Sequence, residues 1–281
     1  MGMEVPLRIG VFDSGIGGLT VLRALRDELP QHDYLYLGDT ARIPYGSRAP
    51  VTVVRYALAV ASYLFEQGAE ALVIACNTAT AHALPAIQQA AAQHGIPVFG
   101  VINPGVTAAL EAHQSGAVAV LGTSGTIAGG AYQSRLRALK PNLELHAVPC
   151  PLFVPLVEEG WLDGEVPEQV ATKYVGHLAG VADTVILGCT HYPLLKPVLS
   201  RVLPGVTLVD SAAATATVVR DALGRGHGPG SVHYMVTDHA ERFSRVGATF
   251  LGRTPEDVTW VDLPPPVPSF ASFLPPSPTD P

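Results

Sequence analysis

Positive charge and thiols are both scarce in this chain of 281 residues. Its 17 lysines and arginines stand against 24 aspartates and glutamates, which gives a formal net charge of -7, and no basic block stands out. This balance argues against nucleic acid or an anionic membrane as the main partner. The three cysteines form no CxxC pair, which argues against a disulfide framework and for a reducing compartment.

Long apolar runs are also missing. No segment approaches the ~18 apolar residues of a membrane span, and the start, Met1-Gly2-Met3-Glu4, has the features of neither a signal peptide nor a myristoylation site. Hydrophobic residues nevertheless make up 48% of the chain and charged residues only 15%, so a sizeable core can be buried. We expect a soluble cytoplasmic protein.

What the chain does contain is a regular alternation of short apolar runs with helical stretches. Strands are expected at residues 7–12, 34–37, 72–75, 97–101, 117–121, 185–187 and 232–236. Helices are expected at residues 19–29, 51–67, 133–139 and 212–223. The alternation predicts an α/β protein with mainly parallel sheets.

The pattern repeats once along the chain. Thr123-Ser124-Gly125 follows Asp13-Ser14-Gly15 by 123 − 13 = 110 positions, and Cys189 follows Cys76 by 189 − 76 = 113. We therefore expect two pseudo-symmetric α/β domains that face each other across a cleft, where open α/β sheets bind their ligands. The expected limits are residues 1–101 plus 209–263 for the first domain and 102–208 for the second.

The last segment, residues 264–281, has a different composition. Eight of these 18 residues are proline. Such a composition favours polyproline II or disorder, so we expect this tail to take no part in catalysis.

Two of the three cysteines stand where strands are expected to stop. Cysteine is often buried simply as a small hydrophobe, and this explanation suits Cys150, which lies between two prolines. At Cys76 and Cys189, backbone amides become free, and Asn77-Thr78 and Thr190-His191 add further polar groups. Free amides and a nearby cation favour the thiolate form. We therefore expect a function for Cys76 and Cys189.

Other interpretations of these motifs are weaker. Asp13-Ser14-Gly15 could be only a turn with a helix cap, and the "GIGG" that follows fits no phosphate-binding loop. His191 could be a surface histidine. A zinc site built from Cys76, Cys189 and His191 has no candidate for a fourth ligand, so no metal is expected.

Two thiols that face each other suit the removal of a proton from one face of a carbon and its return to the other. One sulfur must be thiolate and the other thiol, and their roles exchange with the direction of reaction. A nucleophilic hydrolase needs only one thiol. Pyridoxal phosphate needs a Schiff-base lysine, and none of Lys140, Lys173 and Lys196 ends an expected strand. The pattern therefore indicates stereoinversion at an acidic carbon without a cofactor.

Five motifs resemble the glutamate racemases, which belong to the cofactor-independent aspartate/glutamate racemase superfamily. They are "GVFDSGIGGLTVL", "GDTARIPYGSR", "VIACNTATA", "LGTSGTI" and "LGCTHYPLL". The resemblance runs from about residue 8 to residue 221 and excludes the proline-rich tail. It implies two pseudo-symmetric α/β domains, a homodimer, and reversible conversion of L-glutamate to D-glutamate for peptidoglycan synthesis.

The resemblance also implies roles for individual residues. Cys76 and Cys189 are the expected acid/base pair, with Asp13 assisting the first and His191 the second. Glu158 is a further candidate, although the adjacent Glu159 leaves that choice open. The implied substrate contacts are Asp13, Ser14, Pro44, Tyr45, Gly46, Asn77, Thr78, Thr123, Thr126, Thr190 and His191.

Two rival functions remain open at this point. A racemase of aspartate or another acidic amino acid would share the thiols and differ in the depth of the pocket. A protein that binds an amino acid without turnover is the other rival, although binding alone needs no thiolate.

Overall fold

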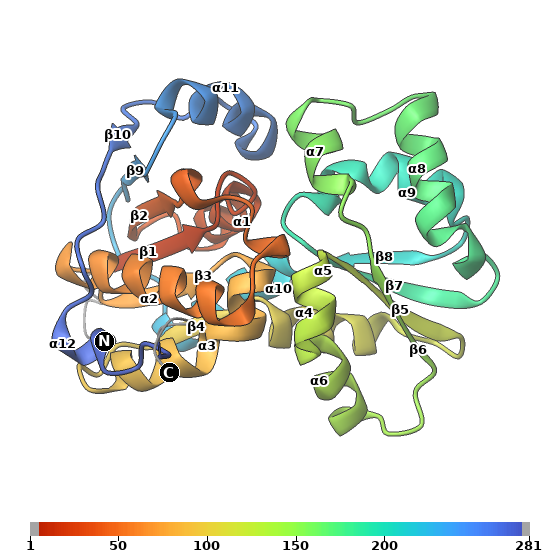
Figure 1. Ribbon diagram of the computed structural model, residues 1–281, viewed down its shortest axis with the longest axis horizontal. Coiled ribbons are helices and arrows are strands. Elements are labelled where there is room, and N and C mark those ends of the chain that lie inside the picture. The colour runs from red at the N-terminus through yellow and green to blue at the C-terminus, as the bar shows by residue number, and fades with distance from the viewer. Residues whose placement is uncertain (1–5, 277–281) are drawn as a thin grey trace.

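Two parallel sheets form the framework of the computed structural model, which describes residues 6–276. The first sheet has the strand order β10 (Thr259–Trp260), β9 (Val232–Val236), β2 (Asp33–Gly38), β1 (Arg8–Asp13), β3 (Ala71–Ile74) and β4 (Val98–Gly100). The second has the order β6 (Leu145–Pro149), β5 (Ala117–Gly122), β7 (Ala182–Gly188) and β8 (Thr207–Asp210). We call each sheet with its covering helices the first or the second half of the molecule (Figure 1).

The two sheets repeat one arrangement of strands. The order β2-β1-β3-β4 corresponds to β6-β5-β7-β8. Phe12 pairs with Ile74 at the end of β1 and β3, and Leu121 pairs with Leu187 near the end of β5 and β7. The expected α/β class with parallel sheets is confirmed, and the polar residues after these strands lie at the carboxyl ends of the sheets.

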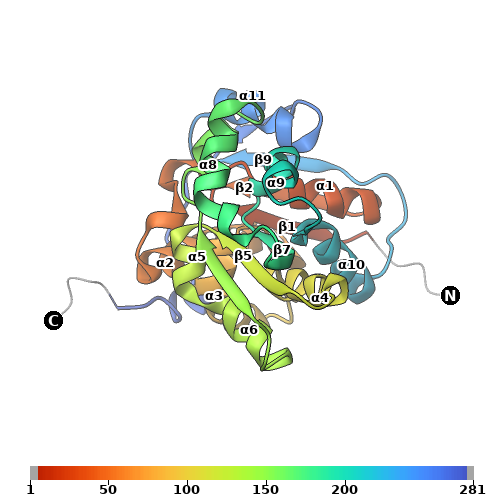
Figure 2. The ribbon, with the colours of Figure 1, turned by 90° about the vertical axis from the view of Figure 1, so that its right-hand side faces the viewer.

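Helices cover both faces of each sheet. In the first half they are α1 (Leu19–Glu28), α2 (Pro50–Glu66), α3 (Asn77–Ala92), α10 (Ser211–Leu223), α11 (Ala240–Leu251) and α12 (Pro268–Ala271). In the second half they are α4 (Ile102–Ala112), α5 (Ser124–Gly129), α6 (Ala131–Leu139), α7 (Phe153–Glu158), α8 (Glu165–Val175) and α9 (Lys196–Val202). The 3₁₀ turns are η1 (Thr40–Arg42), η2 (Tyr45–Ser47), η3 (Gly176–Leu178) and η4 (Tyr192–Leu195). Figure 2 shows α8 and α9 on one side of the second sheet, with α4 and α6 on the other.

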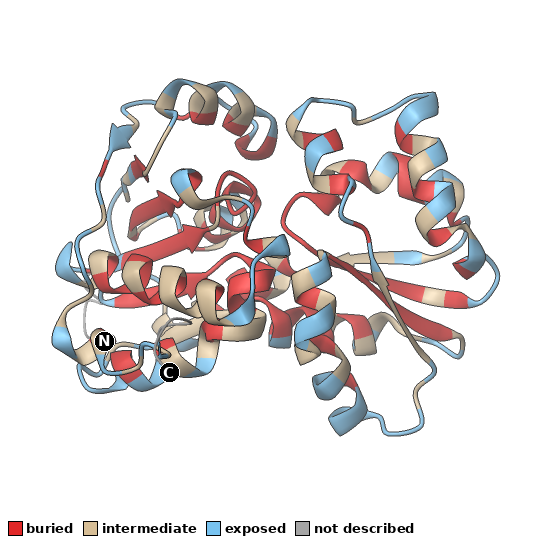
Figure 3. Ribbon diagram, viewed as in Figure 1, coloured by how far each residue is buried: buried red, intermediate tan, exposed pale blue. Residues whose placement is uncertain are grey.

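Alternation along the strands separates the core into layers. On β1, Val11 packs with the core on the α1 and α10 face, whereas Phe12 packs with the core under α2 and α3. The cluster that contains Val11 continues into the second half through Leu121 and Val185. The central strands β1, β2, β3, β5 and β7 are accordingly buried along most of their length, whereas the edge strands β4, β6, β8 and β10 are partly buried or exposed (Figure 3).

Several elements differ from the sequence-based expectations. β6 and the short edge strand β10 were not predicted, because β6 carries the polar His146 and is only partly buried. No helix among residues 6–276 has the length and apolar character that crossing a bilayer requires.

Polyproline II or disorder was expected from residue 264 onward. Val267 does have extended backbone, with φ −60° and ψ 157°, but Pro268–Ala271 form the short helix α12 and the segment is packed. Phe270 in α12 is fully buried, and its ring centroid lies 5.7 Å from that of Phe65 in α2. The N–H of Val267 donates to Oγ of Ser62 over 2.9 Å. One aromatic side chain among the prolines thus anchors this segment to the first half. Residues 277–281 of the tail lie outside the described residues.

Candidate active site

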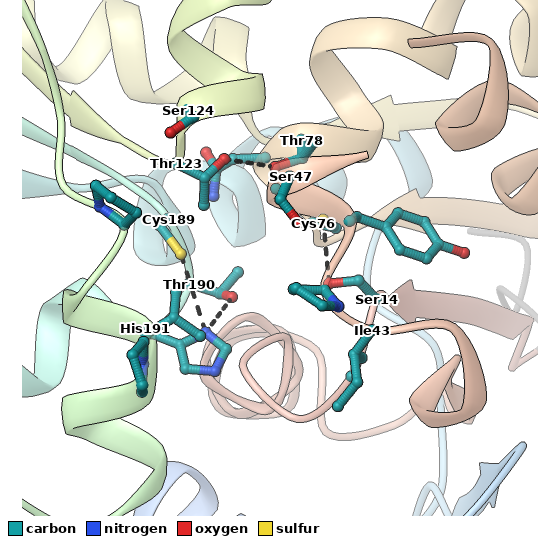
Figure 4. Close-up of a pocket in the computed structure, with 18 of the residues that line it drawn as sticks. Ser14, Ile43, Ser47, Cys76, Thr78, Thr123, Ser124, Cys189, Thr190 and His191 are labelled. Carbon is teal, nitrogen blue, oxygen red and sulfur yellow. Dashed lines mark hydrogen bonds between the residues drawn. The ribbon is translucent and has the colours of Figure 1, made fainter. Parts of the chain in front are cut away.

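A cavity of about 390 Å³ lies at the carboxyl ends of the strands, between the two halves (Figure 4). Its walls combine the loops after β1, β2 and β3 with the loops after β5, β6 and β7. It is lined by Ser14, Gly15, Ile43, Pro44, Tyr45, Gly46, Ser47, Cys76, Asn77, Thr78, Thr123, Ser124, Pro151, Val154, Pro155, Glu158, Cys189, Thr190 and His191. Sequence motifs more than 100 positions apart therefore meet in one place.

Cys76 is the N-cap residue of α3 and projects from the first half. Its sulfur accepts a hydrogen bond from the N–H of Ala79 over 3.4 Å and lies 3.6 Å from Oγ of Ser14. Burial, together with the negative charge of Asp13, raises the pKa of Cys76 to about 12. Cys76 is therefore a thiol at neutral pH in the unliganded molecule.

Cys189 follows β7 in the second half and lies on the opposite side of the cavity in Figure 4. Its sulfur is 3.9 Å from Nδ1 of His191. Burial lowers the pKa of His191, but the hydrogen bonds to Cys189 and Glu158 outweigh burial and raise that pKa to about 10. His191 is therefore an imidazolium at neutral pH, and its Nδ1 faces the sulfur of Cys189.

Glu158, at the end of α7, connects His191 to the first half. Its Oε1 lies 3.2 Å from Nε2 of His191, and its Oε2 accepts a hydrogen bond from Nη2 of Arg242 over 3.1 Å. Burial opposes ionisation, yet His191 and Arg242 lower the pKa of Glu158. The neighbouring Glu159 is exposed and does not line the cavity. Of the two glutamates that the sequence left open, Glu158 is therefore the one that contacts His191.

Two residues expected at the substrate lie behind the wall of the cavity. Asp13 is 1% exposed; its Oδ2 accepts from the N–H of Gly15, and its Oδ1 has no partner among the described residues. Burial raises the pKa of Asp13, and the positive charge of His191 opposes that shift. Thr126 is fully buried, and its hydroxyl bonds to those of Thr78 and Thr123. The geometry thus gives Asp13 and Thr126 supporting positions rather than a place in the lining.

The two halves meet directly beside the thiols. The hydroxyls of Thr78 in α3 and Thr123, the N-cap of α5, are 2.9 Å apart. The backbone of Gly46 packs closely against Thr123, since a Cβ at Gly46 would lie 2.6 Å from Cβ of Thr123. Only a residue without a side chain allows this approach of η2 to α5.

The remaining lining residues were not identified from the sequence. Gly15, Ser47 and Ser124 lie inside the quoted motifs, but they were not singled out as substrate contacts. Ile43 precedes the expected Pro44. Pro151, Val154 and Pro155 follow β6, a strand that the sequence pattern did not reveal.

The cavity is polar without being rich in cations. Among the described residues that line it, His191 is the one side chain that can carry a positive charge. Hydroxyl and amide groups supply most of the polar surface. No group of three His, Cys, Asp or Glu side chains within residues 6–276 is placed to hold a metal ion.

Comparison with known proteins places this architecture in a family. Residues 19–219 match the family described as Asp/Glu/Hydantoin racemase. Glutamate racemase of Geobacter metallireducens is 49% identical over 264 residues, which cover 91% of this chain and 96% of that protein. Glutamate racemase of Francisella tularensis, solved in complex with D-glutamate, has a TM-score of 0.84 at 35% identity and covers 92% of this chain and 98% of its own.

A more distant solved structure extends the comparison. It is Escherichia coli glutamate racemase in complex with L-glutamate and the activator UDP-MurNAc-ala, with a TM-score of 0.74 at 27% identity. The match covers 91% of this chain and 97% of that one. Both sheets of the present structure thus fall within one shared architecture, and the chain belongs to the glutamate racemase family, a family of amino-acid isomerases within the Asp/Glu/hydantoin racemases.

Proposed function

We propose that this protein interconverts L-glutamate and D-glutamate by proton transfer between two thiols, without a cofactor. One observation carries the proposal: Cys76 and Cys189 come from corresponding positions of the two sheets and line the same cavity. The relatives support the substrate, since one was solved with D-glutamate and another with L-glutamate.

The protonated forms of Cys76 and His191 give a starting point for turnover, in which we propose that Cys189 is the thiolate. The thiolate of Cys189, beside the imidazolium of His191, removes the α-proton of L-glutamate, and the C–H electron pair remains on the α-carbon. The thiol of Cys76 then donates its proton to the opposite face. D-glutamate forms, Cys189 becomes the thiol and Cys76 the thiolate. The reverse reaction begins from that second state, so Cys76 is the base toward D-glutamate.

The carbanion is the costly species, because a carboxylate is a poor electron sink. Donors fixed before the reaction stabilise developing charge most effectively in a site that excludes water. The proposed donors are the side chains of Ser14, Asn77, Thr78, Thr123 and Thr190 and the backbone amides beside Tyr45 and Gly46, all in the lining. Pro44 shapes the turn that presents those amides. Asp13 and Thr126 lie outside the lining and act indirectly. Asp13 acts through Cys76, and Thr126 acts through its hydrogen bonds to Thr78 and Thr123.

The wider role follows from the family. We infer that the D-glutamate supplies peptidoglycan synthesis in the cytoplasm, where the three free thiols suit a reducing environment. We also infer a homodimer and two domains. The second domain is best ended after Asp210, where β8 stops and α10 returns to the first sheet.

Circular dichroism of L-glutamate incubated with pure protein tests the function directly. We expect the signal to decay to zero, because the enantiomers have equal free energies, and we expect dialysis against a strong chelator to leave the rate unchanged. L-aspartate is the comparison substrate. If the dichroism of L-aspartate decays while that of L-glutamate persists, the protein is an aspartate racemase. If the dichroism of both amino acids persists, the result favours a binding protein.

A further inference from the structure

Only one of the two polar atoms of the Asn77 side chain has a hydrogen-bond partner among the described residues. Asn77 is the first residue of α3 and lines the cavity. Its Oδ1 accepts a hydrogen bond from the hydroxyl of Tyr132 over 2.7 Å. Its Nδ2 is buried and has no hydrogen-bond partner among the described residues. Buried donors without a partner are rare and need an explanation.

Tyr132 reaches Asn77 from the other half of the molecule. It belongs to α6, is fully buried and does not line the cavity. The side chain of Ser211, at the start of α10, acts to lower the pKa of the same hydroxyl. Burial raises the pKa of Tyr132, so the hydroxyl keeps its proton as a donor.

We propose that Tyr132 is a positioning residue that fixes the orientation of the Asn77 amide, so that Nδ2 donates to a carboxylate oxygen of the substrate. An asparagine amide presents an acceptor and a donor whose places exchange when it flips. The bond from Tyr132 occupies the acceptor, which leaves the NH₂ group for the ligand. A carboxylate can only accept hydrogen bonds. If the amide of Asn77 were flipped, its Oδ1 would face the carboxylate oxygen of the substrate, and neither atom could donate.

Because Tyr132 lies in the second half, the orientation of Nδ2 of Asn77 depends on the contact between the two halves. Asn77 follows Cys76 directly in the first half, whereas Tyr132 follows α5 in the second. The amide is therefore held only when α6 and α3 are in contact. This inference rests on the proposed function, because it assigns the amide to the substrate of that reaction.

Kinetics of Tyr132→Phe test the inference, since this change removes one hydroxyl and keeps the ring. We expect kcat/KM for glutamate to fall roughly tenfold, the scale of one hydrogen bond. In an Asn77→Ala background the same change should have almost no effect, because no amide remains to be oriented. Tyr34→Phe is the matched control: Tyr34 is equally buried, but its hydroxyl donates to the carbonyls of Leu25 and Leu29, away from the cavity.

Equal losses from Tyr132→Phe in the parent and in the Asn77→Ala background would overturn the inference while leaving the proposed function intact. A parent protein that does not racemise glutamate would instead overturn the proposed function. If Tyr132→Phe does not fold, NMR of the parent decides. The side-chain amide signals of Asn77, assigned through Asn77→Ala, should shift when D-glutamate is added, and unchanged signals would contradict the inference.

Discussion

Oε1 of Glu158 lies 3.2 Å from Nε2 of His191, and the other nitrogen of that imidazole faces the sulfur of Cys189. A carboxylate, an imidazole and a thiol thus stand in sequence, with Arg242 of the first half at the outer end. The arrangement keeps a positive charge beside Cys189. The corresponding neighbours of Cys76 are the Ser14 hydroxyl and the buried Asp13, so the two thiols have unlike surroundings despite their matching places in the sheets.

Glu158→Gln should move the alkaline limb of the pH profile to lower pH. Activity requires the imidazolium in this mechanism, so it is lost as pH rises through the pKa of His191, about 10 in the parent. Removing an adjacent negative charge lowers that pKa, and we expect the limb to move by roughly one pH unit or more. The measurement is kcat/KM for L-glutamate against pH. Glu159→Gln is the control: Glu159 is exposed, lies 3.9 Å from Arg242 and has no ion pair with His191 among the described residues, so the profile should stay nearly unchanged.

Cys76→Ser and Cys189→Ser should each abolish racemisation in both directions, because every turnover uses both sulfurs. A hydroxyl is a far weaker acid, so we expect losses of roughly 1,000-fold or more. The surviving thiol can still exchange a proton on its own face. In deuterated water, Cys189→Ser should slowly exchange the α-proton of D-glutamate, and Cys76→Ser that of L-glutamate, as followed by proton NMR.

The third thiol provides the control for these variants. Cys150 is buried but does not line the cavity, and its sulfur contacts the carbonyl oxygen of Val148. Cys150→Ser should therefore racemise at close to the parental rate. Near-parental activity in either of the other two variants would show that its cysteine is structural.

Gly46→Ala should impair catalysis by pushing the two halves apart. The new methyl group would collide with Thr123, and displacements of about 1 Å in an active site can cost roughly 100-fold in rate. Gly15→Ala is the milder variant for comparison, because its Cβ would meet only the Cγ2 methyl group of Ile43, at 3.2 Å. Comparing kcat/KM of the two variants checks the prediction; equal and small losses would mean that the contact between η2 and α5 is dispensable.

Phe270→Ala should lower stability without slowing the reaction. The side chain is fully buried against α2, and emptying such a site typically costs about 3 kcal/mol or more of unfolding free energy. No lining residue of the cavity lies in residues 264–276. Urea unfolding and kcat, measured together, should show a lower midpoint at unchanged turnover. Leu274→Ala, at a partly exposed position of the same segment, should change neither.

The sequence predicted the parts of this site that depend on local pattern. Cys76 and Cys189 were identifiable because an apolar strand followed by small polar residues ends at the carboxyl edge of a parallel sheet. The choice between Glu158 and Glu159 was different, because it depends on which side of α7 faces His191. Arg242 gave no signal at all, since its partner is 84 positions away in the chain.

Amino-acid composition did not predict the structure of segments whose packing depends on a single side chain. Eight prolines favoured polyproline II or disorder, yet a short helix forms among them and its Phe270 packs against α2. The loop after β6 was missed for a related reason. Its Pro151 and Pro155 contribute apolar surface to the cavity, and neither bears a reactive group that a motif search would find.

In the proposed function the pocket holds an anionic substrate by hydroxyl and amide dipoles, with a single imidazolium among its described lining residues. This arrangement determines how the protein responds to ionic strength. Mobile ions screen separated charges in solvent over about a Debye length, but they screen buried groups much less. Substrate capture should therefore vary little between dilute buffer and concentrated salt. The protein would then discriminate among anions by the directions of its donors rather than by the amount of charge that a metabolite carries.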